Sequence, residues 1–101
     1  MSEKLLLRVA ESLPLPGLGV LLRSQDAPPE LAHVELHTAL RLTLRYPSGE
    51  VQPTTATVEE IARPGEPERR VLLLTQHGAT PVPAGTEVWW TGEAASWEDL
   101  L

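Results

Sequence analysis

The stretch Leu13-Pro14-Leu15-Pro16-Gly17-Leu18-Gly19-Val20-Leu21-Leu22 decides the fold class of this chain. Its two prolines and two glycines stand between apolar runs that are too short and too interrupted for a helix. Proline lacks the N–H group that the interior of a strand needs, and glycine permits turns that other residues resist. We therefore expect a bend between two strands near the start of a small all-β domain.

Strands are predicted on both sides of this bend, over residues 5–13 and 19–25. The side chains of a strand alternate between its two faces. In the first strand this alternation places Leu5, Leu7 and Val9 on one face and Leu6, Arg8 and Ala10 on the other.

Further along the chain, the pattern of residues 40–46 is typical of a half-buried strand, because every second residue is apolar. The next stretch, Tyr46-Pro47-Ser48-Gly49-Glu50, has the proline and glycine of a turn. Residues 51–61 are predicted to return as the second strand of a long hairpin. Residues 71–74 are apolar on both faces and are expected at the centre of the sheet, which residues 87–91 close.

The chain has 101 residues, enough for one domain and too few for two. We expect a β-barrel domain over residues 1–91 and an acidic C-terminal tail over residues 92–101. Within the tail, Ser96 precedes Asp99 at the spacing of a capping box, which predicts a single helical turn.

The net charge is −6, from 14 acidic and 8 basic residues. Because nucleic-acid binding requires cations that displace phosphate counterions, this balance argues against nucleic acid and anionic membranes as partners. It favours a protein partner, in particular a basic one, although an acidic surface can also serve solubility alone. The absence of cysteine excludes disulfides, thiolate metal ligands and a cysteine nucleophile.

The N-terminal residues do not resemble a secretory leader, because their apolar run is short and no small-residue cleavage site follows it. No stretch approaches the roughly 18 apolar residues of a membrane span. We therefore expect a cytoplasmic protein that does not associate with membranes.

Four stretches, in their order and spacing along the chain, resemble segments of a known protein family. They are Leu15-Pro16-Gly17-Leu18-Gly19-Val20-Leu21, Ala32-His33-Val34-Glu35-Leu36-His37-Thr38-Ala39-Leu40-Arg41-Leu42, Thr55-Ala56-Thr57-Val58-Glu59-Glu60-Ile61 and Val82-Pro83-Ala84-Gly85-Thr86-Glu87-Val88. Over residues 5–91 the chain resembles the second domain of translational GTPases such as elongation factor Tu. The resemblance implies a small, closed or nearly closed antiparallel β-barrel of Greek-key type, present here as a free-standing domain.

In that family the barrel contacts the acceptor end of tRNA or the ribosome, so the resemblance implies a translation-associated role as one alternative. Glycines of the family are replaced here by Ser24, Ala32 and His37. The chain has no G-x-x-x-x-G-K-[S/T] motif, so neither nucleotide binding nor GTP hydrolysis is expected.

His33, Glu35 and His37 are spaced two residues apart. On an extended strand their side chains would share one face, and such a pair of histidines could bind zinc with a third ligand such as His77. If residues 32–38 instead include a turn, as the resemblance suggests, the two histidines diverge and face solvent. The sequence leaves both interpretations open.

Trp89 and Trp90 must point to opposite faces of the closing strand. One is expected in the core, and the other is either an exposed interface anchor or is covered by Trp97, Leu100 and Leu101 of the tail. We therefore take Trp89, Trp90 and Trp97 as candidate interface residues. The acidic residues Glu98 and Asp99 extend this candidate interface as docking groups for a basic partner.

The chain offers little for catalysis. No serine lies in a Gly-x-Ser-x-Gly motif, and Glu59 and Glu60 face opposite ways as neighbours on a strand. We predict a non-enzymatic binding module without a cofactor, which acts through protein contacts as a regulatory or immunity-type protein. The alternatives are a translation-associated protein that contacts tRNA or the ribosome and a small metal-binding protein that uses His33 and His37.

Overall fold

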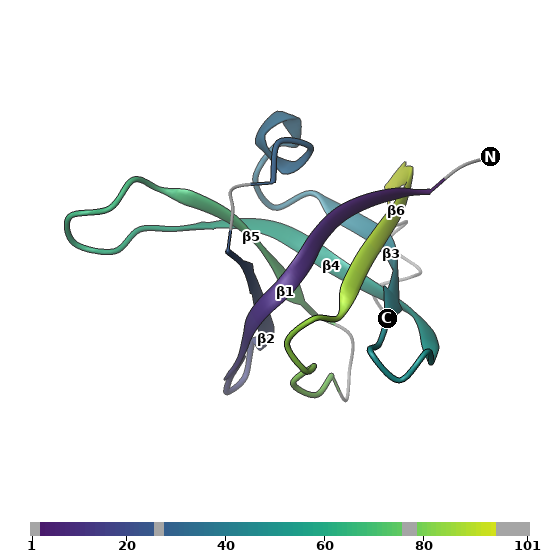
Figure 1. Ribbon diagram of the computed structural model, residues 1–101. Coiled ribbons are helices and arrows are strands. Elements are labelled where there is room, and N and C mark those ends of the chain that lie inside the picture. The colour runs from purple at the N-terminus through teal and green to yellow at the C-terminus, as the bar shows by residue number, and fades with distance from the viewer. Residues whose placement is uncertain (1–2, 26–27, 76–78, 95–101) are drawn as a thin grey trace.

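The computed structural model of the chain describes residues 3–25, 28–75 and 79–94. It is a closed barrel of antiparallel strands, which confirms the predicted all-β class (Figure 1). The elements are β1 (Lys4–Leu15), β2 (Gly19–Ser24), the short 3₁₀ helix η1 (Leu31–His33), β3 (Ala39–Arg45), β4 (Val51–Ile61), β5 (Arg69–Leu74) and β6 (Glu87–Ala94). Within these ranges no helix is long and apolar enough to cross a membrane.

The strands follow the order β1-β2-β5-β4-β3-β6 around the barrel. Successive hairpins join β3, β4 and β5, whereas β2 lies beside β5 and not beside its neighbour in sequence, β3. This arrangement is the predicted Greek key. Figure 1 shows that η1, on the connection from β2 to β3, lies at one end of the barrel. The β4–β5 hairpin projects outward from the barrel.

The bend between β1 and β2 is shorter than expected. β1 continues to Leu15, and Pro14 lies within the strand opposite Val20. The turn itself occupies residues 16–18, where the Leu18 amide donates to the Leu15 carbonyl at 2.9 Å. Strand β1 tolerates Pro14 because this part of β1 pairs with β2 alone, so one edge of the strand needs no N–H donor there.

Leucine and valine side chains fill the barrel. In β3 the predicted alternation is confirmed, with Leu40, Leu42 and Leu44 buried and Arg41 and Arg45 exposed. The core cluster consists of Leu6, Leu7, Val9, Val20, Leu22, Leu31, Leu40, Leu42, Leu44, Ala56, Val58, Leu72, Leu74, Val82 and Val88. β5 pairs with β2 and β4, but every strand of a closed barrel has two neighbours, so none is central. Val71, Leu72 and Leu74 are buried and Leu73 is half-buried.

The predicted alternation in β1 is wrong at its start. The pairing register between β1 and β6 shifts between Leu5 and Leu7, which makes Leu6 an extra residue in the ladder. At such a β-bulge two residues oppose one, and the alternation of faces is offset. Leu6 and Leu7 are therefore both buried, 4% and 5% exposed, whereas Leu5 is 38% exposed.

β6 begins at the predicted Glu87 but continues to Ala94, which pairs with Leu40. Glu93 thus belongs to the strand and not to the expected tail. Residues 95–101, including the predicted capping pair Ser96 and Asp99, lie outside the described part of the chain.

Candidate functional site

The two adjacent tryptophans of β6 face opposite sides of the barrel wall, as predicted. Trp90 packs against the core cluster, and its indole N–H donates to the Glu93 carbonyl at 2.9 Å. Trp89 is half-buried on the outer side. Its position there defines the candidate site, because tryptophan at a partly exposed position is a frequent interface anchor.

Trp89 lies at the centre of three strands. Its directly opposite neighbours are Leu5 on β1 and Thr43 on β3, and opposite residues share one face of a sheet. The Arg45 guanidinium lies over the indole ring, 4.5 Å from the ring centroid. This distance is well within the range of cation–π attraction, which favours the position of the arginine over the ring.

A row of charged residues runs beside Trp89 on the same face. Glu87 lies directly between Arg8 on β1 and Arg45 on β3. The Arg8 Nη2 donates to Glu87 Oε2 at 2.9 Å, and the Trp89 indole N–H donates to Glu87 Oε1 at 3.1 Å. These two donors, that of Arg8 first, hold the pKa of Glu87 below its ordinary value, since both stabilise the carboxylate.

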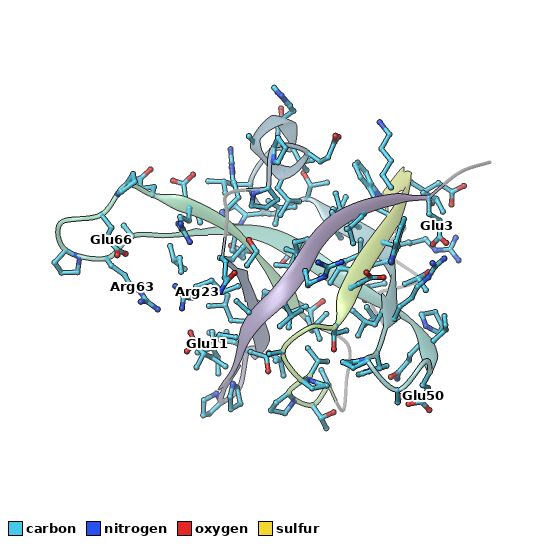
Figure 2. All side chains as sticks on the ribbon, in the orientation of Figure 1. Glu3, Glu11, Arg23, Glu50, Arg63 and Glu66 are labelled. Atoms are coloured by element: carbon cyan, nitrogen blue, oxygen red, sulfur yellow. The ribbon has the colours of Figure 1, made fainter. Side chains whose placement is uncertain are left out.

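Glu3 completes the arrangement, because the Arg45 Nη2 also donates to its carboxylate at 3.1 Å. Figure 2 shows Glu3 beside the N-terminal end of β1. We call this surface the Trp89 face and define it by Glu3, Leu5, Arg8, Thr43, Arg45, Glu87 and Trp89. Each polar group of its charged row is already oriented by a neighbour, so the face presents a pre-organised surface to a partner.

Sequence reasoning identified Trp89 but missed the residues around it. The sequence pattern indicated that Thr43 and Arg45 face outward, since they lie on the polar face of a clearly alternating strand. No pattern indicated that Leu5 and Arg8 share this outer face. They lie on opposite faces by simple alternation, and only the bulge at Leu6 brings both to the outer side.

Acidification should reveal the link between Glu87 and Arg8. Because the pKa of Glu87 is lowered in the folded state, its contribution to stability is present above the ordinary value of 4.5 and is lost as pH falls through the lower folded value. In Arg8→Gln, the pKa of Glu87 should rise towards 4.5, measured by NMR titration of the Glu87 carboxyl carbon. Arg63→Gln, a change in the β4–β5 connection beside Glu11, should leave it unchanged. An unaltered pKa in Arg8→Gln would refute the link.

The charge on the Trp89 side of the barrel is balanced. Arg8, Arg41 and Arg45 pair there with Glu87, Glu93 and Glu3 respectively. Six other acidic residues lie elsewhere: Glu30 and Glu35 flank η1, and Glu59, Glu60, Glu66 and Glu68 belong to the β4–β5 hairpin. Figure 2 shows that Glu11, Arg23 and Arg63 lie together, apart from Glu3. They form a separate ion-pair cluster, in which Glu11 lies 3.2 Å from Arg23 and 3.8 Å from Arg63.

The proposed metal ligands His33, Glu35 and His37 do not lie on an extended strand. His33 ends η1, and the chain turns at residues 35–38, where the Thr38 amide donates to the Glu35 carbonyl at 3.3 Å. The extended interpretation is therefore wrong, because Leu31 and Val34 pack into the core and force a compact connection. Across the described ranges, no group of three or more histidine, aspartate or glutamate side chains could hold a metal ion. His77 lies outside those ranges.

His37 has a different set of contacts. Its amide donates to the Val58 carbonyl at 2.6 Å, and its Nδ1 lies 2.9 Å from the Glu59 carboxylate. The Thr57 hydroxyl donates to the other oxygen of Glu59 at 2.8 Å. The neighbouring Glu60 instead pairs with Arg70 at 3.7 Å, as expected for the opposite face of the strand. His37 therefore ties the turn after η1 to β4.

The backbone of His37 is left-handed, with a φ of 70°, a conformation that costs an L-residue about 1 kcal/mol. We expect His37→Gly to be as stable as the wild type or up to about 1 kcal/mol more stable, since the His37 side chain is 75% exposed and Glu59 keeps its hydrogen bond from Thr57. His37→Val should be destabilised by more than about 1 kcal/mol, because β-branched residues resist this conformation. Urea denaturation of the two variants tests this order. A valine variant as stable as the glycine variant would contradict it.

The remaining candidate interface residues Trp97, Glu98 and Asp99 lie outside the described part of the chain. Their packing against Trp89 or Trp90 stays a prediction. No family model, curated protein or solved structure matches this chain significantly.

Proposed function

We propose that this protein is a non-enzymatic binding module that acts through protein contacts made by the Trp89 face. The observation that carries the proposal is the Trp89 ring, half-buried at the centre of three strands with Arg45 stacked on it. Tryptophan and arginine are the residue types most enriched among the residues that dominate binding energy. Leu5, 38% exposed beside the ring, adds apolar area that a partner can bury.

The charge pattern supports a protein as the partner. A surface for nucleic acid needs unpaired cations for phosphates, whereas the arginines of this side are matched by carboxylates. The net charge of −6 acts at longer range and favours the approach of a basic protein. A regulatory or immunity-type protein that neutralises a basic partner fits both features.

Capture of partners from native lysate, followed by titration of the purified partner, tests the proposal. Trp89→Ala should weaken binding at least tenfold, the effect expected for a central interface tryptophan. The matched control is Leu18→Ala, which also truncates an apolar side chain, 65% exposed and located in the turn between β1 and β2. Equal binding by the wild type and Trp89→Ala would refute the role of the Trp89 face. Circular dichroism of each variant verifies that the barrel is intact.

One observation favours the alternative of a translation-associated protein. His37 stands where the second domain of translational GTPases, which this chain resembles, has a glycine. The backbone of His37 is left-handed, a conformation that glycine adopts more easily than other residues. This alternative predicts binding to tRNA or ribosomes that weakens steeply with salt. Absence of such binding at low salt would exclude it and would leave the protein-binding proposal in place.

A further inference from the structure

A groove adjoins the Trp89 face and has no role in the function proposed so far. It is a cavity of about 510 Å³ along residues 6–10 of β1. Its other walls are the end of β2 with Ser24 and Gln25, the following Pro28 and Pro29, and the turn at Ala84 and Gly85. Among the described residues that line it, Arg8 is the one that carries a charge.

One edge of β1 is open beside this groove. β1 pairs with β2 only from Val9 onwards, because β2 ends at Ser24. Among the described residues, positions 4–8 pair with β6 alone. Figure 1 shows β1 leaving β2 and continuing beside β6 towards the N-terminus. An edge of this kind presents backbone N–H and C=O groups in the spacing that another strand can match.

We propose that this groove binds an extended peptide segment of the protein partner by strand addition to the open edge of β1. The backbone of the segment would continue the ladder that β2 leaves at Ser24, which is how peptides add to exposed sheet edges. The Arg8 guanidinium is 63% exposed and contacts Glu87 through one nitrogen, Nη2. Its remaining N–H groups can donate to a second carboxylate, so the peptide side chain that faces Arg8 is a carboxylate. A partner that is basic overall can carry a single carboxylate at this position.

The groove is continuous with the Trp89 face through Arg8, which belongs to both. The same bulge at Leu6 that turns Leu5 and Arg8 outward lies within the open edge. The strand-addition site therefore rests on the proposed function and extends it, since it names the element of the partner that is recognised. The Trp89 face would anchor the folded part of the partner, and the groove would hold its extended segment.

The probe is a short blocked peptide of alternating threonine and valine with one central glutamate. Titrated into the full chain labelled with ¹⁵N, it should shift the amide signals of residues 6–10, Ser24 and Gln25. The same peptide with alternate backbone nitrogens methylated should not bind, because it cannot complete the ladder. Glutamine in place of the central glutamate should weaken binding about threefold, the effect of an exposed ion pair.

Arg8→Gln should abolish the difference between the glutamate and glutamine peptides, whereas Arg63→Gln should retain it. Failure of the peptide to shift residues 6–10 at millimolar concentration, or equal binding of the methylated peptide, would overturn the strand-addition site. A partner that still depended on Trp89 in that case would leave the proposed function standing. Conversely, peptide binding at residues 6–10 combined with a partner indifferent to Trp89→Ala would support the groove and refute the Trp89 face.

Discussion

Gly19→Ala is expected to lower the free energy of unfolding by more than about 3 kcal/mol, a large effect for a single methyl group. Gly19 begins β2 with a φ of 138°, which L-residues rarely adopt. A Cβ atom there would overlap the carbonyl oxygen of Leu74 on β5. Because that oxygen belongs to the backbone of a central strand, it cannot move aside without disturbing the pairing of β2 with β5.

Gly17→Ala is the matched control for this substitution. Gly17 also has a positive φ, 80°, but a Cβ there would meet no atom within 4 Å. Gly17→Ala should lower the free energy of unfolding by about 1 kcal/mol, which is the cost of placing an alanine at a positive φ. Urea denaturation followed by circular dichroism measures both variants. Equal costs for the two would contradict the close approach of β2 and β5 at Gly19.

Leu6→Ala is expected to destabilise the barrel by about 2–5 kcal/mol, the range for truncating a buried leucine. Leu6 is 4% exposed and belongs to the core cluster, where its loss would leave a cavity that the surrounding strands fill only in part. The free energy of unfolding from chemical denaturation measures this loss. Because simple alternation places Leu6 on the face opposite Leu7 and Val9, a large cost is direct evidence for the bulge in β1.

Leu5→Ala is the control, since it removes the same atoms from the adjacent position. Leu5 is 38% exposed on the outer side, so its truncation should cost less than about 1 kcal/mol. The reverse order of the two costs would show that β1 alternates regularly and that Leu5 faces the core. That result would also remove Leu5 from the Trp89 face.

Much of the barrel could be predicted from short patterns. The alternation of residues 40–46 and the turn at Gly49 depend on neighbours a few positions away, and both are confirmed. The run at residues 71–74 is buried except for Leu73, which is half-buried. The extended interpretation of residues 33–37 failed because alternating polar residues also occur in turns. The packing of Leu31 and Val34 against the core decided that this segment is a turn and not an extended strand.

The candidate site was harder to predict than the fold. Trp89 could be selected by residue type, and the opposite orientation of Trp90 followed from strand geometry. The surroundings of Trp89 could not be selected in this way. They depend on which residues of β1 and β3 lie opposite β6, and Leu5 and Thr43 are far from Trp89 in the sequence.

By itself, the sequence determined the class of fold, the turns at Gly17 and Gly49 and the inward face of its most regular strand, because these follow from local backbone preferences and from the two-residue period of a strand. Only the tertiary structure decided the bulge at Leu6, the position of β6 between β1 and β3 and the left-handed turn at His37. The physical reason is barrel closure. Closing the sheet fixes the register between strands that are distant in the chain, and a bulge is how one strand meets the register of both neighbours.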